Sequence, residues 1–531
     1  MSRASPDLEA PLLLVRNDGP PVKGPAGVAV QSKSQLAQQN PTRLSIDWSS
    51  TTGLRGLCAV QIMVGHFFFG MAPRSLRQVC NDPGVTDKAY AVIVAMDQPV
   101  ALFFLLSGLL YGVLYYDKLD WIQPVFSSSS HDKNQPQQRP ESTSSKKTNY
   151  EVWKTFTQRR FARLAPAWYV ALLCMMPFYL PDENLRPQRT KVEGTLTAVT
   201  FLQSVLGPPD GFPHVIPPPH GPGWQISAFM LSYACLPPVF WLFKRLPDVA
   251  LALLIVALFG VSLGVMQLCL YWIPIGFVHS FFFARFPNVM MGVALGMLAK
   301  RRVCPEKRTH QESFIWSAFD RMSILSTSLP TNKTSLVSEK RKWLLDGCFA
   351  IYVCYNAGYV PLTHYDGDIW LQFYLLPLYC VWLWWLVVVV DNTKGKEILE
   401  PPQRSSAMIT SGGEKNSTSY SSTISEQAQA ARKPTVVETV LTSECLQTTG
   451  DWSYVLYCFH WPTYYFATWL LSGFSTEFIW HRCLILAQGN GCFGMEYWHL
   501  PIAVGLCFCF SGFFSIYVED RIRKKIDAVL G

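Results

Sequence analysis

The sequence predicts an all-α membrane protein with about ten transmembrane helices and both termini in the cytoplasm. Only 15% of its 531 residues are charged, whereas soluble domains carry about 25%. Apolar segments long enough to cross a bilayer recur along the chain. Lys and Arg gather at alternate ends of these segments, as the positive-inside rule expects of a multi-pass protein. The net charge of +8 therefore reflects membrane orientation and does not indicate a nucleic-acid-binding face.

Each expected span is an apolar run of about twenty residues, and the runs are separated by polar or proline-rich stretches. Pro274 and Pro287 interrupt the fifth and sixth runs, which a membrane helix tolerates where neighbours satisfy its backbone. The spans are expected at residues 54–72, 92–116, 161–180, 224–243, 249–270, 276–299, 344–361, 369–390, 452–473 and 498–518.

The polar stretches predict the domain organisation. Residues 1–46 are rich in Pro, Gly, Ser and Gln and lack the long apolar region of a cleavable signal, so we expect a disordered cytoplasmic N-terminus. A membrane domain follows over residues 47–526, and residues 527–531 form a short tail. Similar composition predicts polar cytoplasmic insertions at 127–149, 304–334 and 394–438.

The opposite side of the membrane receives a proline-rich loop over 180–223, whose length is typical of a lid or linker. Cys80, Cys483 and Cys492 also fall on that side, where a disulfide could form without the sequence indicating the pairing. Most of the fifteen Cys lie inside apolar runs, and no Cys/His cluster has zinc spacing, so we expect no metal site.

The first span carries two ionisable residues, Arg55 and His66. Eleven residues are close to three turns, so both should lie on one helix face, roughly 16 Å apart along the axis. Ionisable groups at membrane depth usually face a cavity, a path or a partner. Taken singly, Arg55 could lie at the membrane surface, and His66 could form a hydrogen bond with a neighbouring helix. Their shared register favours a functional pair.

Three arginines open the third span, where Arg159, Arg160 and Arg163 stand at helical spacing. Guanidinium groups suit phosphate, so a cluster facing the cytoplasm could hold a nucleotide-bearing donor. The alternative is anchoring of the helix against anionic lipid.

Three further spans contain polar positions that could serve either packing or a site. Ser107 precedes Gly108, and small residues permit close helix contact. Trp224 and Ser227 begin the fourth span, where a tryptophan fits an interfacial belt. His460 lies inside the ninth span and should pair with another helix or line the same cavity as His66.

Taken in order, these stretches resemble the acyltransferase-3 family of integral membrane O-acyltransferases, over about residues 47–526. The family carries an arginine, ten residues and a histidine in its first helix, then F-F-x-x-S-G, R-R-x-x-R-x-x-P-x-Y and S-Y-x-x-Y-x-x-H-x-P elements. The matching residues here are Arg55 and His66; Phe103, Phe104, Ser107 and Gly108; Arg159, Arg160, Arg163 and Pro166, with Tyr169 one place late; and Ser453, Tyr454, Tyr457, His460 and Pro462.

The chain departs from the family pattern at two carboxylate positions. Phe229 stands where the fourth-helix element carries glutamate, and Gln225 replaces a serine of the same element. Ala101 occupies the place of an aspartate before F-F-x-x-S-G. If either carboxylate contacts the acceptor or supports the histidine, this chain has a different acceptor, a different proton path or reduced activity.

The resemblance implies transfer of an acyl group, often acetyl, from cytosolic acyl-CoA to a hydroxyl of a carbohydrate or lipid, with no permanently bound cofactor. His66 would act as base, Arg55 would orient the donor, and the third-span arginines would hold the CoA phosphates. The residues on the supporting or acceptor side would be Ser107, Trp224, Ser227, Tyr454 and His460.

Two other functions stay open. His66, His460 and Arg55 could form the proton relay of a coupled transporter, and Pro274 and Pro287 could mark its broken helices. A non-catalytic scaffold derived from the family would accommodate the missing carboxylates. The sequence does not distinguish the plasma membrane from an endomembrane.

Overall fold

The computed structural model describes thirteen stretches of the chain, all within one compact unit, Arg43–Gly531. Predicted features outside these stretches include Cys80, Cys483, Cys492, Pro274 and most of the polar insertions. The described residues are 43–46, 48–71, 99–116, 149–180, 188–206, 223–272, 281–303, 334–356, 375–391, 435–471, 499–519, 521–522 and 524–525.

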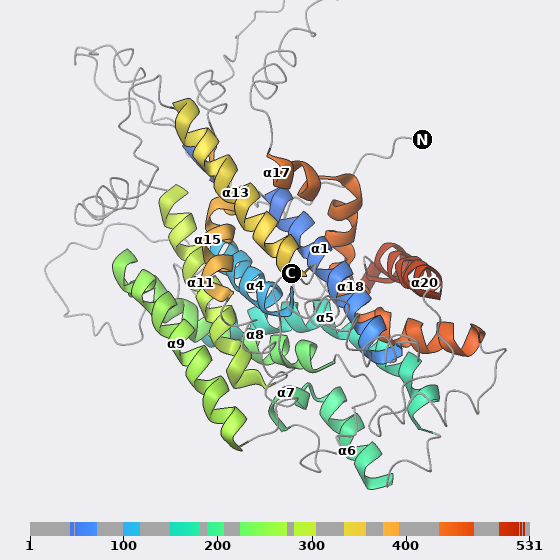
Figure 1. The fold of residues 1–531 in the computed structure, drawn as a ribbon. Coiled ribbons are helices and arrows are strands. Elements are labelled where there is room, and N and C mark those ends of the chain that lie inside the picture. Colours follow the sequence, from blue (N-terminus) through green and yellow to red (C-terminus); the bar gives the residue numbers. More distant parts are fainter. Residues whose placement is uncertain are drawn as a thin grey trace, which may run out of the picture. The chain divides into compact units, whose positions relative to one another are not determined.

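Helices make up nearly all of the described structure, as the sequence predicted (Figure 1). They are α1 (Trp48–Met71), α4 (Pro99–Tyr115), α5 (Asn149–Tyr179), α6 (Gln188–Val199), α7 (Gln203–Leu206), α8 (Gly223–Arg245), α9 (Asp248–Trp272), α11 (Phe282–Val303), α13 (Thr334–Asn356), α15 (Leu376–Val387), α17 (Val436–Leu441), α18 (Glu444–Leu471), α20 (His499–Phe514) and a π-helical turn, η7 (Ser515–Glu519).

Five of the described helices are long and apolar enough to cross a membrane, which agrees with a multi-pass membrane protein. Two shorter apolar helices are Pro99–Tyr115 and Leu376–Val387. The total of about ten spans and the cytoplasmic termini stay predictions. The five spanning segments are Trp153–Tyr179, Gly223–Arg245, Asp248–Leu268, Phe282–Val303 and His499–Glu519.

One pair of strands departs from the all-helical expectation. β1 (Arg43–Ile46) pairs antiparallel with β2 (Val388–Asp391). β1 falls inside the predicted disordered N-terminus, and β2 takes the last three residues of the predicted span 369–390. β2 begins with Val388-Val-Val, and β-branched residues favour strands.

Several predicted loops contain helices. α6 and α7 lie within the expected loop 180–223, and α5 and α13 begin at the last residues of two expected insertions. α17 begins inside the third insertion because Thr435 and Glu438 form a capping box. The Glu438 amide donates to Thr435 Oγ1 at 3.0 Å, and the Thr435 amide donates to Glu438 Oε2 at 2.9 Å.

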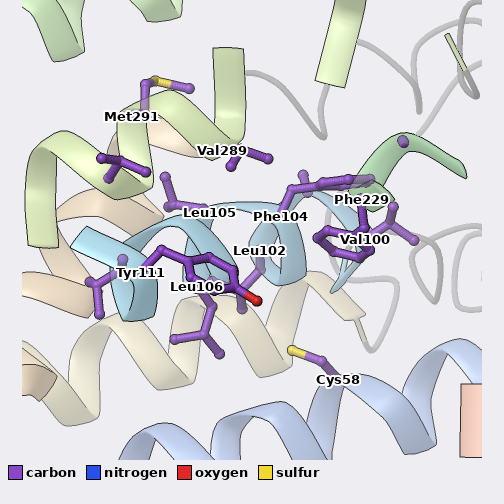
Figure 2. Packing of buried hydrophobic residues seen from close by; sticks show 14 of the residues in the cluster. Cys58, Val100, Leu102, Phe104, Leu105, Leu106, Tyr111, Phe229, Val289 and Met291 are labelled. Carbon is purple, nitrogen blue, oxygen red and sulfur yellow. The ribbon is translucent and has the colours of Figure 1, made fainter. Parts of the chain in front are cut away.

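Glycines bring α4 and α11 into backbone contact. A Cβ at Gly108 would lie 2.0 Å from the Val289 carbonyl oxygen, and one at Gly292 would lie 2.0 Å from the Leu105 carbonyl oxygen. Figure 2 shows Leu105 directed toward Val289 in this interface. Close approach of this kind stabilises membrane helix pairs through van der Waals contact. α9 packs along the other side of α11 (Figure 1).

α1 and α18 meet in the same way, and this pair carries His66 and His460, the two histidines predicted at membrane depth. A Cβ at Gly56 would lie 2.4 Å from the Leu446 carbonyl oxygen, and one at Gly450 would lie 2.0 Å from the Thr52 carbonyl oxygen. The contacts advance along both helices together, from Gly53 beside Leu441, just before α18, to His66 beside His460, so α1 and α18 run parallel, as the first and ninth spans of an alternating topology would.

A buried ion pair joins three helix ends next to the basic residues of α8 and α11. Arg301 Nη1 lies 2.8 Å from Asp248 Oδ1. The same guanidinium donates to the carbonyl oxygens of Leu246 at 2.8 Å and Lys244 at 2.9 Å, and to Tyr116 Oη at 3.2 Å. Arg301 thus satisfies carbonyl groups that the end of α8 leaves without helical partners.

Candidate active site

The two predicted intramembrane histidines are in direct contact. Nδ1 of His66 in α1 lies 2.9 Å from Nε2 of His460 in α18. Their rings are stacked at 5.0 Å between centroids and 13° between planes. His460 is fully buried and its Nδ1 lies 2.7 Å from the Tyr457 carbonyl oxygen, whereas His66 is half-buried. The two side chains form a short chain of hydrogen bonds that ends at the backbone of α18.

This geometry determines the tautomers of the neutral pair. A carbonyl oxygen only accepts hydrogen bonds, so Nδ1 of His460 carries the proton and donates to Tyr457. Nε2 of neutral His460 is then an acceptor, and Nδ1 of His66 donates to it. The lone pair of neutral His66 is therefore on Nε2, the nitrogen that would take a proton from a substrate.

Aromatic side chains of α18 enclose the histidine pair. Tyr464 lies edge-on to His460 at 5.7 Å between centroids and donates to the Met63 carbonyl oxygen at 2.6 Å. Trp461 lies edge-on to His66 at 6.2 Å. The Tyr464 hydrogen bond ties α18 to α1 one turn from His66.

Arg55 also faces α18, at the end of α1 nearer the third-span arginines. Its Nη2 donates to Thr52 Oγ1 at 3.3 Å, and its Nε is buried without a hydrogen-bond partner among the described residues. Arg55 and Arg163 repel one another, and Asp451 of α18 attracts both. The structure thus brings together two predicted residues and adds Asp451. Its position just before the S-Y-x-x-Y-x-x-H element was the sequence signal that could have identified it.

Arg160 differs from its two neighbours. Its guanidinium carbon lies 4.7 Å from the Tyr111 ring centroid, 5.2 Å from Tyr115 and 5.7 Å from Phe156, and it donates a hydrogen bond to Tyr115 Oη. These contacts join α4 to α5 through cation–π interactions. Arg160 is therefore held inside the protein, which departs from its expected place in a phosphate-binding cluster. Arg159 and Arg163 are exposed.

Two of the predicted supporting residues, Ser227 and Tyr454, make hydrogen bonds between helices. Ser107 is half-buried beside Gly108 on α4. Ser227 Oγ donates to the Phe201 carbonyl oxygen and lies 2.9 Å from Ser204 Oγ, which attaches α7 to α8. Tyr454 Oη donates to the Leu164 carbonyl oxygen at 2.6 Å and attaches α18 to α5. Ser227 and Tyr454 thus hold neighbouring helices together.

Aromatic packing fills the position of the fourth-helix carboxylate. Phe229 is buried and stacks on Phe104 at 4.5 Å between centroids, and Figure 2 shows both rings in the core. Phe104 also stacks on Trp224 at 6.2 Å, and Ala101 is fully buried. Neither position can therefore supply a negative charge.

Comparison with known families agrees with this arrangement. The model of the acyltransferase-3 family, described as an acyltransferase domain, matches residues 48–400, which is more than half of the chain. The match includes Arg55, His66 and the third-span arginines, and it ends before His460. No curated protein and no solved structure matches the chain significantly. The chain is thus an integral membrane protein that belongs to the acyltransferase-3 family.

Proposed function

We propose that this protein is an O-acyltransferase that moves an acyl group, acetyl in the simplest case, from cytosolic acyl-CoA to a hydroxyl of a carbohydrate or lipid. The observation that carries the proposal is the hydrogen-bonded chain from His66 through His460 to the Tyr457 carbonyl oxygen. It presents the half-buried, oriented imidazole of His66, whose Nε2 can act as a general base.

The arginines supply the donor site in this proposal. Arg159 and Arg163 are exposed on α5 and would bind the phosphates of acyl-CoA, a co-substrate that leaves after each turnover. Arg55 has a buried Nε without a protein hydrogen bond among the described residues and would orient the donor further in. Arg55 and His66 are separated by roughly 16 Å along α1, which the extended pantetheine arm would bridge.

The reaction then needs one proton transfer in each direction. Nε2 of His66 takes the proton of the acceptor hydroxyl as its oxygen attacks the thioester carbonyl carbon. The tetrahedral intermediate collapses with cleavage of the C–S bond, and the imidazolium returns the proton to the departing CoA thiolate. His460 keeps its proton on Nδ1 throughout and acts as a positioning residue, since it holds the His66 ring and its tautomer.

The test is consumption of radiolabelled acetyl-CoA by the purified protein in lipid nanodiscs, with pools of carbohydrate and lipid acceptors. We expect His66→Ala to lower turnover by about 10²- to 10⁴-fold, the usual contribution of a general base. Tyr464→Phe is the matched control, because it removes a buried contact between the same helices and leaves both histidines.

Three results would overturn the proposal. Undiminished turnover in a folded His66→Ala variant would show that His66 is not the general base. Binding of acetyl-CoA without consumption in any pool would indicate a scaffold. Absence of acetyl-CoA binding, together with solute uptake into proteoliposomes, would indicate a transporter.

A further inference from the structure

Two buried amide side chains near the start of α8 have unmet hydrogen-bonding groups. Gln203 of α7 is 6% exposed, and neither its Oε1 nor its Nε2 has a partner in the described structure. Gln225 of α8 is 1% exposed, and its Oε1 is likewise unpaired there. A buried polar group left unsatisfied destabilises the fold, so native proteins usually provide it with a partner.

The Gln203 amide lies directly against the first residue of α8. A Cβ on Gly223 would stand 2.6 Å from Gln203 Oε1 and 2.3 Å from Trp168 Cη2, so only glycine fits between them. Hydrogen bonds from Ser204 to Ser227 hold α7 in this position. The first amide groups of α8 have no helical acceptors, and the helix dipole makes this end positive.

A buried cation lies at the same place. Arg285 of α11 is fully buried, and its guanidinium carbon is 5.8 Å from the centroid of the Trp224 ring. The described residues of α4, α7, α8 and α11 include no Asp or Glu. The aromatic residue Phe229 and the methyl group of Ala101 add no negative charge on the α4–α8 side. At this end of the four helices, Arg285 is therefore the one charged side chain among their described residues.

This cluster lies at the ends of α8 and α11 opposite their basic last turns, which hold Lys244 and Arg245 in α8 and Lys300 to Arg302 in α11. In the predicted topology those basic turns share the cytoplasmic side with Arg159 and Arg163. A ligand at the cluster would thus enter from the side opposite the donor.

We propose that Gln203, Gln225 and Arg285 form an acceptor subsite for an anionic group, a phosphate or carboxylate, that carries a neighbouring hydroxyl. The identity of this ligand as the acceptor rests on the proposed function. Arg285 and the start of α8 neutralise the anion, since guanidinium and helix amides both bind phosphate and carboxylate oxygens. The two amides donate to and accept from the hydroxyl, which gives their buried groups the partners they lack.

The test measures binding without acyl-CoA, so it can succeed or fail independently of catalysis. Thermal unfolding of the intact protein in detergent is followed while glycerol 3-phosphate, glycerate or neutral glycerol is added. We expect both anions, and not glycerol, to raise the unfolding temperature of the wild type. Arg285→Met should weaken the apparent affinity for the anions at least about 10-fold, since hydrogen bonds to charged groups contribute about 1.5–3 kcal/mol. Gln203→Leu should weaken it by roughly 2- to 12-fold, since it removes hydrogen bonds to a neutral hydroxyl.

Ser262→Ala is the matched control. Ser262 donates to Asn288 Oδ1 of α11 at 3.1 Å, so the variant loses a buried hydrogen bond one turn from Arg285 and keeps the proposed subsite. It should bind the anions as the wild type does. Gln203→Leu changes α7 and Arg285→Met changes α11. If one variant fails to fold, the anion affinity of the other still tests the proposal.

Nanodiscs distinguish a lipid from a soluble source of the anion. Stabilisation by phosphatidylglycerol in phosphatidylcholine nanodiscs, lost in both variants, would assign the subsite to a lipid headgroup. Stabilisation by the soluble anions alone would assign it to a soluble acceptor. No stabilisation by either source, equal stabilisation by glycerol, or unchanged affinity in both variants would overturn the proposal.

Discussion

Replacement of His460 by alanine tests whether this residue positions His66 or acts separately. The change removes the acceptor that lies 2.9 Å from His66 Nδ1, so the His66 ring loses both its orientation and its enforced tautomer. A net hydrogen bond contributes about 0.5–1.5 kcal/mol. Since 1.4 kcal/mol is about a factor of ten, kcat should fall by roughly 2- to 12-fold.

That loss is much smaller than the one expected for His66→Ala, about 10²- to 10⁴-fold. A positioning residue has no effect once the base it positions is gone. The double variant should therefore be no slower than His66→Ala alone, as for groups that act as a unit. His460→Gln should be milder than His460→Ala, because the amide oxygen can still accept from His66 Nδ1.

The assay is single-turnover acyl transfer with saturating donor, normalised to folded protein. Normalisation is needed because His460 is fully buried, and its truncation leaves a cavity that lowers stability. Tyr464→Phe removes another α1–α18 hydrogen bond, 2.6 Å in length, and should lower stability by about 0.5–1.5 kcal/mol with unchanged kcat. If the reductions in kcat caused by the two single changes multiply in the double variant, His460 does not act by positioning His66.

Three further predictions concern stability and donor binding. Gly108→Leu should destabilise the fold by more than about 1–3 kcal/mol in thermal unfolding, because its Cβ would lie 2.0 Å from a carbonyl oxygen of α11. Gly260→Leu, with no atom within 4 Å of its Cβ, should be neutral, and equal effects would contradict the packing argument. Arg301→Met should cost about 3–5 kcal/mol of unfolding free energy because Asp248 stays buried and uncompensated, and Asp248→Asn in the same chain should restore part of it. Arg163→Gln should raise the KM for acetyl-CoA by up to about 5-fold, since exposed charge pairs contribute about 0.2–1 kcal/mol, and 0.5 M salt should abolish the difference.

Much of the helical architecture follows from local sequence. The apolar runs predict α1, α8, α9 and α18 to within a few residues at most boundaries, because bilayer thickness sets helix length. The start of α17 could also have been predicted, since Thr435 and Glu438 have the spacing of a capping box. The polar composition of the surrounding residues led instead to the prediction of an insertion. β1 and β2 could not be read in this way, because each strand is short and its partner is more than 300 residues away.

Part of the candidate site could likewise be predicted from the sequence, and part depends on contacts between helices. The eleven-residue spacing of Arg55 and His66 indicates one helix face, and in the structure both interact with α18. The contacts of Arg160 could not be predicted, because Tyr111 and Tyr115 come from another helix and periodicity within α5 cannot show what a neighbouring helix presents. From spacing alone, the same role was predicted for Arg159, Arg160 and Arg163.

The sequence by itself therefore determined what depends on near neighbours in the chain: helix existence, the shared face of Arg55 and His66, and membership of the acyltransferase-3 family. Only the tertiary structure decided which distant groups meet. His66 and His460 are 394 positions apart, and their contact depends on the glycine-mediated approach of α1 and α18. The unmet amide of Gln203 is likewise a property of packing, since a side chain has a hydrogen-bond partner, or lacks one, only when every helix around it is in place.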